Sequence, residues 1–327
     1  MFLENIRKKC MIIMTWNIYI GADLTPLINT TPQQLPAVVT EVFNQLEQTD
    51  FPARAKAIAR QICQTEPDLI GLQEVALWTV QSPQTKSVLN FLNVLLAELK
   101  KLALDYRVVA VNKNFRDKLP SSTGDVIGVL DRDVLLARCQ LPIKFSNIQE
   151  DNFQSNLVVP IGSQPFTILR GWSAVDIDLY EQKFRLLNTH LEGESLEVRM
   201  AQAEELLTGP GATDLPLIFI GDFNSNAADS GAPTYHLLIN AGFNDAWELA
   251  GKGPGFTAFQ ARDLLNPVSS LSERIDLILF RNGLKVKRVN RVGERQRDRT
   301  PCGLWPSDHA GVVATLNLSR TRLCTRD

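Results

Sequence analysis

The stretch PLIFIGDFNSNAAD, residues 216–229, joins an apolar run to a pair of polar side chains. Residues 217–220 are apolar and partly β-branched, a pattern typical of a buried β-strand. The run stops at Gly221, and Asp222 and Asn224 follow two residues apart, so that on an extended chain both side chains point to one face. Gly, Asp and Asn are also common turn residues. The stretch alone therefore fits a plain turn and a functional strand end equally well.

Composition bounds the class of protein but not its activity. The chain has 327 residues, of which 44% are hydrophobic and 21% charged, as in an ordinary globular protein of one large domain or two smaller ones. The formal net charge of -2 gives no overall attraction to nucleic acid or to an anionic membrane. A polyanionic substrate is still compatible with the sequence, provided that the basic surface for it is local.

The two ends of the chain and its cysteines favour a cytoplasmic protein without stable membrane insertion. No apolar run approaches the roughly 20 residues that a membrane-spanning helix needs. The basic patch at residues 7–9 precedes an apolar stretch that is too short for a signal peptide and lacks a small-residue cleavage site. We therefore expect a leader and the start of the first strand at residues 1–13, one domain at residues 14–318 and a tail at residues 319–327. The five cysteines are scattered and include no Cys-x-x-Cys pair, which favours reduced thiols over disulfides or a zinc site.

The order of apolar patterns predicts an α/β fold. Apolar residues at helical spacing predict helices at residues 53–65, 84–104, 195–207 and 234–241, and apolar runs between them predict strands. Residues 172–180 and 183–191 alternate like an antiparallel pair that turns at residues 181–182. Antiparallel pairs within an alternating order favour mixed sheets, and so many strands favour two packed sheets with helices outside. Residues 112–164 are less regular, with short candidate strands between loops.

Several predicted strands end in polar side chains of the types that bind phosphate and metal ions. A strand end is a rigid base for a site, and in α/β sheets the crevice beyond the strand ends is the usual position of a ligand. Each residue also has a structural explanation, such as a turn, an exposed charge, a hydrogen-bonded core histidine or an ion pair of Asp276 with Arg274. Their joint occurrence favours a site. The set comprises Asn17, Glu74, His190, Asp222, Asn224, Asp276, Asp308 and His309.

Attack by water on a phosphoester is a reaction that all of these residue types serve. It requires a divalent metal, a group that orients or deprotonates the water, and donors to the phosphate oxygens. Mg²⁺ prefers one or two carboxylates, and Glu74, helped by Asn17 and Asp308, fits this preference. We expect Mg²⁺, with Mn²⁺ as an alternative, because the chain has too few His and Cys for a dedicated zinc site. Asp276 would orient His309 and hold its charge, as in other carboxylate–imidazole pairs.

The same residues carry a family resemblance that covers most of the chain. The pieces TWN, LQE, NTHLEGESLEVRMAQAEEL, GDFNS, RID and SDH occur in the order found in the endonuclease/exonuclease/phosphatase superfamily, which the sequence resembles over roughly residues 14–318. GDFN followed downstream by SDH is the specific combination. The resemblance implies the DNase I-like fold, a four-layer α/β sandwich in which two mixed β-sheets pack face to face with helices on both outer sides.

The resemblance also implies roles for the polar residues that would meet the metal and the water. Glu74 would be the main metal ligand, with Asn17 and Asp308 near it. Asp222 would activate or orient the attacking water, or would assist the leaving group. These are expectations carried over from the family, position by position, onto the residues of this chain.

The remaining positions would bind the phosphate and complete the reaction. Asn224 and His190 would bind the phosphate, and His309, paired with Asp276, would act as a base or would stabilise the transition state. The implied activity is hydrolysis of a phosphodiester or phosphomonoester, as in a nuclease, a phospholipid or sphingomyelin phosphodiesterase, or a small-molecule phosphatase. The alternative is a catalytically silent binding protein on the same scaffold. The sequence gives no indication of the oligomeric state.

The resemblance is weaker in the middle of the chain. The DNA-repair branch of the superfamily carries a Tyr near the phosphate in this region, whereas TGDVIGVLDRDVLLARC, residues 123–139, has none. This difference argues against an abasic-DNA substrate. Asp131, Arg132 and Asp133 stand there instead, as in a poorly described bacterial subgroup. Asp133 either contacts the site or, as we expect, is a loop charge or an ion-pair partner.

Two further stretches fit either the site or ordinary structure. Residues 288–299 are locally basic, and we expect a solvated loop rather than a contact with nucleic acid. Phe256, Phe259, Leu264 and Leu265 fit an apolar lip for a lipid headgroup, but we expect them to pack in the core.

Overall fold

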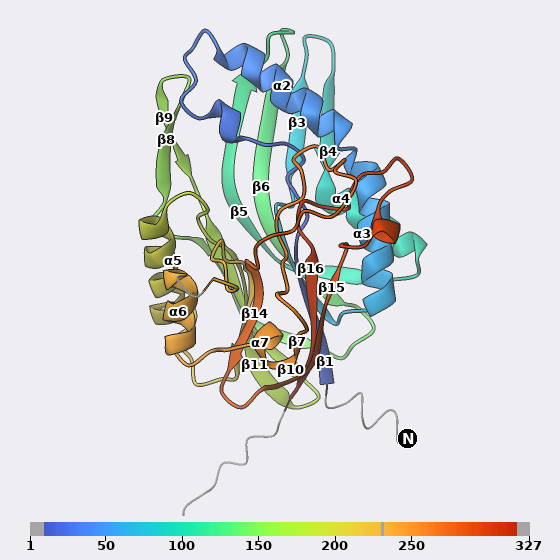
Figure 1. The fold of residues 1–327 in the computed structure, drawn as a ribbon, viewed down its shortest axis with the longest axis vertical. Helices are drawn as coiled ribbons and strands as arrows, with labels where there is room; N and C mark the ends of the chain where they lie inside the picture. The colour runs from blue at the N-terminus through green and yellow to red at the C-terminus, as the bar shows by residue number, and fades with distance from the viewer. Residues whose placement is uncertain (1–9, 230–231, 319–327) are drawn as a thin grey trace, which may run out of the picture.

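Two β-sheets packed face to face form the centre of the molecule, and helices cover both outer faces (Figure 1). The structure is a computed structural model that describes residues 10–229 and 232–318. The arrangement confirms the predicted four-layer α/β sandwich. The predicted leader and tail fall largely on residues 1–9 and 319–327, outside the described residues, and the first strand already begins at Cys10.

The larger sheet has eight strands in the order β15-β16-β1-β2-β6-β3-β4, with β5 paired to β6. It is mixed, because β1 and β2 run parallel whereas the other neighbours run antiparallel. Its strands are β1 (Cys10–Asn17), β2 (Leu69–Gln73), β3 (Leu77–Gln81), β4 (Lys86–Asn90), β5 (Tyr106–Pro120), β6 (Val126–Arg138), β15 (Lys285–Val292) and β16 (Gly311–Asn317).

The smaller sheet has six strands in the order β13-β14-β12-β11-β10-β7. It is mixed as well, with β11 and β12 parallel and the other neighbours antiparallel. Its strands are β7 (Lys144–Asn152), β10 (Gly171–Leu179), β11 (Gln182–His190), β12 (Leu217–Asp222), β13 (Asn244–Asp245) and β14 (Asp276–Arg281). A separate hairpin is formed by β8 (Leu157–Ile161) and β9 (Gln164–Ile168).

Helices cover the outer face of each sheet (Figure 1). The larger sheet carries α2 (Leu35–Gln48), α3 (Phe51–Thr65) and α4 (Phe91–Lys101), and the smaller sheet carries α5 (Leu196–Thr208) and α6 (Pro233–Asn240). The short elements are η1 (Thr25–Leu27), α7 (Ala246–Ala250) and η2 (Gln296–Asp298). No helix of the described residues is both long enough and apolar enough to span a bilayer.

Strand β12 explains why its sequence is apolar without a break. Ile218 and Ile220 belong to the core between the two sheets, whereas Leu217 and Phe219 belong to the core beneath α5 and α6. Successive side chains of a strand point to opposite faces, so a strand covered on both faces needs an apolar residue at every position. The same sandwich therefore buries the strand that ends in Asp222 on both sides.

The structure corrects the prediction of one long helix at residues 84–104. Lys86–Asn90 forms β4, which pairs antiparallel with β3, and α4 begins only at Phe91. Val88, which we assigned to the apolar helix face, is 55% exposed on this edge strand. Residues 112–164 are also more regular than predicted, because β5 and β6 form a long antiparallel pair. In both cases pairing with a distant strand decides the structure, and local periodicity does not record it.

A buried arginine joins the segments on which the polar strand ends depend. Arg54 in α3 is fully buried, and its guanidinium donates to the carbonyl oxygens of Thr49, Ile18, Pro306 and Tyr19 at 2.8 to 3.2 Å. Burial lowers the pKa of Arg54 to about 10, which still leaves the side chain charged at neutral pH. One side chain therefore fixes the chain after β1 against the chain that precedes β16.

We predict that Arg54→Met lowers the free energy of unfolding by about 3 kcal/mol, because four interior carbonyl groups lose a donor at once. Urea unfolding followed by circular dichroism measures the change. Arg60→Met is the matched control, since Arg60 is exposed on the same helix, and its effect should stay within about 0.5 kcal/mol. Equal midpoints for the two variants would contradict the role given to Arg54.

Candidate active site

The registers of β11, β12 and β14 align three polar residues in one row across the smaller sheet. His190 lies opposite Asp222 in the parallel pair, and Asp222 lies opposite Asp276 in the antiparallel pair. Residues that face each other across neighbouring strands project to the same side of the sheet. The distance from His190 Nε2 to Asp222 Oδ2 is 3.5 Å. Three side chains distant in sequence thus start from adjacent points on one rigid edge.

The chain around Asp222 is both a strand end and a tight turn. A Cβ on Gly221 would lie 2.0 Å from the carbonyl oxygen of Thr189, so only glycine permits the close approach of β12 to β11 at this point. Asp222 Oδ1 accepts a hydrogen bond from the backbone N–H of Asn224 at 2.9 Å, and Asn224 has a left-handed backbone with φ 48°. Asn224 Nδ2 donates to the carbonyl of Leu191 at 2.8 Å. The plain turn and the functional strand end that the sequence allows are therefore compatible, because the turn orients the side chains of Asp222 and Asn224.

The larger sheet contributes Asn17 at the end of β1 and Glu74 directly after β2. Asn17 Nδ2 donates to Glu74 Oε1 and to Asp222 Oδ2, both at 3.1 Å. Glu74 Oε2 accepts the backbone N–H of Ile20 at 2.6 Å. Glu74 also has a left-handed backbone, with φ 58°, an uncommon conformation that is often retained at functional sites. Asn17 therefore links carboxylates that come from the two sheets.

His309 and Asp276 form the expected carboxylate–imidazole pair. His309 Nδ1 lies 2.8 Å from Asp276 Oδ2, and the opposite ring nitrogen, Nε2, lies 3.9 Å from Asp222 Oδ2. The backbone of His309 is held by the indole N–H of Trp16, which donates to its carbonyl at 3.0 Å. Arg274 pairs with Asp245 and Glu248, so the ion pair that would have explained Asp276 as a structural residue is not formed.

Burial controls the protonation of the carboxylates. Burial, together with the neighbouring Asp276, raises the pKa of Asp222 to about 7. Burial, together with Glu74, raises the pKa of Asp308 to about 6. Carboxylic acids with such pKa values lose their proton more readily when a cation binds next to them. The acidic end of the site is therefore poised to accept positive charge.

The two imidazoles differ in charge. Burial, Arg170 and His309 lower the pKa of His190 well below its usual value, so this ring is neutral. Arg170 Nη1 lies 3.1 Å from His190 Nδ1, and because a guanidinium only donates, the proton of the neutral ring is on Nε2, which faces Asp222. Burial alone would lower the pKa of His309, but Asp276 and Asp308 outweigh it and raise that pKa well above its usual value.

A cavity of about 570 Å³ opens over these residues. Its lining includes six of the eight predicted site residues, and the other two, Asn17 and Asp276, lie behind it and hold residues that face it. The structure thus brings all eight to one end of one cavity. The six that line it are Glu74, His190, Asp222, Asn224, Asp308 and His309.

Sequence reasoning missed a polar cluster next to His190. Asp133, for which we expected a loop charge or an ion-pair partner, is a fully buried residue of β6, and so is Asp131. Asn114 Nδ2 donates to Asp131 Oδ2 at 3.0 Å and to Asp133 Oδ2 at 2.9 Å, and Arg170 Nη1 lies 3.7 Å from Asp131 Oδ2. Arg170 follows β9, and a basic residue at the end of the largely apolar stretch QPFTILR was the available signal. The cluster holds the arginine that orients His190.

Two groups of side chains in the described residues have ligand atoms close enough to hold a metal ion. One is Asp131, Asp133 and His190, where the Arg170 guanidinium already lies beside Asp131 and His190, although Asp131 Oδ1 and Asp133 Oδ1 have no hydrogen-bond partner among the described residues. The other is Asp222, Asp276 and His309, in which the imidazole already pairs with a carboxylate.

Glu74 and Asp308 fit a divalent cation better than either group. Both line the cavity, and repulsion from Glu74 contributes to the raised pKa of Asp308, so a cation beside the two carboxylates would stabilise them. The amide oxygen of Asn17 accepts the backbone N–H of Tyr19 at 3.0 Å. Asn17 positions Glu74 through its amide nitrogen, and because an amide oxygen has a second lone pair, its role as a metal ligand stays a prediction.

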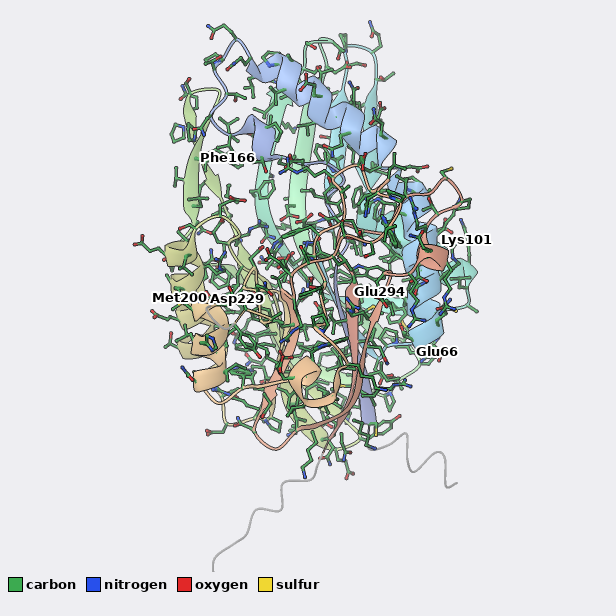
Figure 2. The ribbon with its side chains drawn as sticks, in the orientation of Figure 1. Glu66, Lys101, Phe166, Met200, Asp229 and Glu294 are labelled. Carbon is green, nitrogen blue, oxygen red and sulfur yellow. The ribbon has the colours of Figure 1, made fainter. Side chains whose placement is uncertain are left out.

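The surrounding stretches follow the expectations only in part. Residues 288–292 are not a loop but belong to β15, and Phe259 and Leu265 do not pack in the core, since they are 44% and 51% exposed. Leu264 is buried, but Phe259 lines the cavity, where its ring stands edge-on to His309 with centroids 5.6 Å apart. In the basic stretch at residues 288–299, Arg291 pairs with Glu294 at 2.9 Å (Figure 2 labels Glu294). The four cysteines within the described residues are unpaired, and Cys324 lies outside them.

Comparisons with known proteins agree with this architecture. A model described as the Endonuclease/Exonuclease/phosphatase family matches residues 14–309. Tyrosyl-DNA phosphodiesterase 2 of Mus musculus is 25% identical over 317 residues, which covers 91% of this chain and 72% of that protein. An endonuclease/exonuclease/phosphatase structure from Bacteroides vulgatus is similar with a TM-score of 0.60 and 18% identity, over 95% of this chain and 99% of that chain. A mannosyl-6-phosphatase of Bacteroides thetaiotaomicron is similar with a TM-score of 0.55 and 18% identity, over 94% of this chain and 99% of that chain.

The charge states of the histidines are directly testable, because the chain has only three. We predict that His190 stays neutral at pH 6 with its proton on Nε2, and that Arg170→Gln raises the pKa of His190 because one of the causes that lower it is removed. Nitrogen-15 NMR of the imidazoles reports both the pKa and the tautomer. Arg116→Gln is the matched control on the exposed side of β5. A wild-type His190 that titrates near its usual value of about 6.5 would contradict the geometry.

Proposed function

The chain belongs to the endonuclease/exonuclease/phosphatase family, and we propose that it is a divalent-metal-dependent phosphoesterase that attacks its substrate with water. The observation that carries this proposal is the meeting of carboxylates, imidazoles and amides from both sheets at one end of a single cavity. Such a set offers a metal site, donors to phosphate oxygens and an acceptor for the proton of water.

Glu74 and Asp308 would hold the cation, which is Mg²⁺ in this proposal, with Mn²⁺ as a substitute. When bound, the cation supplies neutralisation of the phosphate charge and makes a water molecule more acidic. Asn17 keeps the Glu74 carboxylate in place through its hydrogen bond at 3.1 Å. Arg54 supports the same end of the site, since it anchors the backbone after β1 and before Asp308.

The phosphate would bind against His190, Asn224 and His309. The Nε2–H of neutral His190 is available to a phosphate oxygen, and Asn224 lines the same part of the cavity. His309 presents Nε2 to the cavity while Asp276 holds Nδ1 at 2.8 Å, so a charged ring can stabilise negative charge on the phosphate. Donors on both sides would fix the orientation of the phosphorus for in-line attack.

Asp222 would orient the water and accept its proton. Two donors bind it, Asn17 Nδ2 and the backbone N–H of Asn224, while His190 Nε2, at 3.5 Å, lies beyond a normal hydrogen-bond distance. A carboxylate fixed in this way keeps one lone pair for a water molecule above it. The raised pKa of Asp222, about 7, matches the requirement for proton transfer at neutral pH.

Similar proteins indicate which substrates to test. Tyrosyl-DNA phosphodiesterase 2 points by its name to a phosphodiester between tyrosine and DNA, and the Bacteroides phosphatase points to a mannose 6-phosphate. The two names suggest testing both a phosphodiester of a nucleic acid and a phosphomonoester of a sugar. The structural counter-hypothesis is a binding protein that retains the scaffold without turnover, which the full set of acidic and imidazole residues disfavours.

We predict that the purified chain hydrolyses bis(4-nitrophenyl) phosphate with Mg²⁺, that EDTA abolishes the activity, and that added Mg²⁺ or Mn²⁺ restores it. Glu74→Gln should lower kcat by about 100-fold or more, because one of two carboxylates for the cation is neutralised. Glu41→Gln, on the exposed face of α2, is the control and should be unaffected. A panel of tyrosyl-DNA, RNA, sphingomyelin and sugar phosphates would then locate the natural class.

Hydrolysis that resists EDTA would contradict the metal requirement. Absence of hydrolysis across the whole panel would favour the binding protein.

Replacement of His309 or Asp222 separates the proposed chemistry from folding. His309→Ala and Asp222→Asn should each lower kcat by about 100- to 10,000-fold while circular dichroism remains that of the wild type. The control is His236→Ala, because His236 lies in α6 on the outer layer, away from the cavity lining, and should keep at least half of the activity. A large loss for His236→Ala, or unfolding of the other two variants, would show that the site is drawn wrongly.

A further inference from the structure

The cavity continues from the catalytic end into an apolar branch. This branch is formed mainly by apolar side chains of β5, β6, the β8–β9 hairpin and the η1 segment. Asp117, between Phe115 and Leu119 on β5 and opposite Val129 of β6, adds one carboxylate to it. Figure 1 shows the hairpin standing beside β5 with the η1 segment between them, and Figure 2 labels Phe166 on this hairpin. The apolar branch comprises Leu24, Leu27, Ile28, Phe115, Leu119, Val129, Val159, Ile161, Phe166 and Ile168.

The hairpin connects the branch directly to the catalytic end. Phe166, Ile168 and Arg170 all line the cavity, whereas Thr167 and Leu169 between them do not. This spacing of two places their side chains in one line, with about 7 Å between successive members of a strand. The last member, Arg170, contacts His190 Nδ1 at 3.1 Å. A substituent on a phosphate bound at His190 would therefore lie along Ile168 and Phe166.

The wall of the branch is held in place from behind. The backbone N–H of Gly162, at the hairpin tip, donates to Thr30 Oγ1 at 3.0 Å, and the N–H of Ser163 donates to the carbonyl of Thr30 at 3.1 Å. On the inner side, the ring of Phe166 stands edge-on to Phe115 with centroids 6.1 Å apart. The apolar surface is thus present before any ligand binds, and little ordering is needed to use it.

The charges around the cavity disfavour a second anionic group. The lining contains eight carboxylate residues and two arginines. Both arginines are already engaged, since Arg170 lies 3.7 Å from Asp131 and Arg262 pairs with Asp23. Among the described residues no lysine lines the cavity. A nucleic-acid strand needs cations along its phosphates, and this lining does not offer them beyond the catalytic end. The eight carboxylates belong to Asp23, Glu74, Asp117, Asp131, Glu192, Glu194, Asp222 and Asp308.

We propose that the apolar branch binds an uncharged apolar group that the substrate carries on its phosphate, so that the substrate is a hydrophobic phosphate ester and not a nucleic-acid strand. This inference rests on the proposed function, because it assumes that the phosphate occupies the catalytic end. The whole cavity, at about 570 Å³, takes a phosphate together with a single ring or a short chain. An aryl ester and an alkyl ester share this chemistry, and the test distinguishes them.

Binding of simple monoesters measures the branch without relying on turnover. We would titrate methyl, butyl and phenyl phosphate into the full chain with Mg²⁺ by calorimetry, because each carries one substituent and the same charge. Each buried methylene contributes roughly a fourfold gain in affinity. The expected result is that butyl or phenyl phosphate, or both, bind at least tenfold tighter than methyl phosphate. Whichever of the two gains more identifies the branch as a chain or a ring site.

Variants of the β8–β9 hairpin test whether the higher affinity for butyl or phenyl phosphate comes from the apolar branch. Phe166→Ala and Ile168→Ala should each remove most of the gain while leaving the affinity for methyl phosphate unchanged. Val158→Ala is the matched control, since Val158 lies on the same hairpin, is 57% exposed and does not line the cavity, and it should keep the full gain. Two hairpin variants are used so that misfolding of one does not decide the test. An unchanged affinity for methyl phosphate shows that the catalytic end of the cavity is intact.

Three results would overturn the proposal. They are equal affinities of the wild type for methyl, butyl and phenyl phosphate, a gain that persists in both hairpin variants, and tighter binding of the dinucleotide pTpT than of phenyl phosphate. Turnover of bis(4-nitrophenyl) phosphate is measured separately on the same preparation. If the chain turns over bis(4-nitrophenyl) phosphate with metal but binds the three monoesters equally, the apolar branch is not a substrate site and the proposed phosphoesterase activity stands. If butyl or phenyl phosphate binds more tightly than methyl phosphate but no turnover occurs, only the proposed phosphoesterase activity is contradicted.

Discussion

The site depends on the register of β12 between β11 and β14. Because Asp222 lies opposite both His190 and Asp276, a single row across the smaller sheet supplies an imidazole, a carboxylate and the carboxylate that holds His309. A shift of β12 by one residue would turn Asp222 to the opposite face and would move Ile218 and Ile220 out of the core between the sheets. The apolar core and the polar row are therefore fixed together. Gly221 completes this arrangement, since no larger residue fits against Thr189 at the point where the two strands converge.

Burial of this row has an electrostatic cost that the surroundings only partly offset. Asp222 and Asp308 have raised pKa values because burial disfavours their charged forms, and the cationic side chains near them are few. The neighbouring pair of Asp131 and Asp133 has the same cost, because burial raises the pKa of both carboxyls even though Arg170 and Asn114 lie beside them. The two acidic clusters differ in their neighbours. Arg170 lies between Asp131 and His190 and orients that ring, whereas Glu74 and Asp308 line the cavity, as a cation site requires.

The sequence predicted the parts of this structure that are recorded locally. An apolar run that ends in Gly, Asp and Asn describes β12 and its turn, and the helix that begins after Ser195 follows its capping residue, whose hydroxyl accepts the N–H of Val198. The parts that were missed depend on partners far along the chain. Val88 was assigned to a helix because its spacing is helical, but β3 pairs with its segment as an edge strand. Asp133 was assigned to a loop or an ion pair because nothing nearby marks Asn114 as its partner. The eight polar site residues could be named from motif order, but, apart from the pair of Asp276 with His309, their hydrogen bonds could not.

The catalytic end and the apolar branch of the cavity favour opposite kinds of chemical group, and this difference restricts the class of ligand that fits. The catalytic end is lined by carboxylates, so an anion binds there only with a cation and the imidazoles beside it. A few residues along β9, the same wall becomes apolar, and its remaining charges are carboxylates or arginines that already have partners. A ligand with charge at both ends would lose hydration at the apolar branch without gaining a hydrogen bond. A ligand with one anionic group and one uncharged apolar group meets both demands, because the position of Arg170 between the two surfaces aligns the phosphate with the start of the apolar wall.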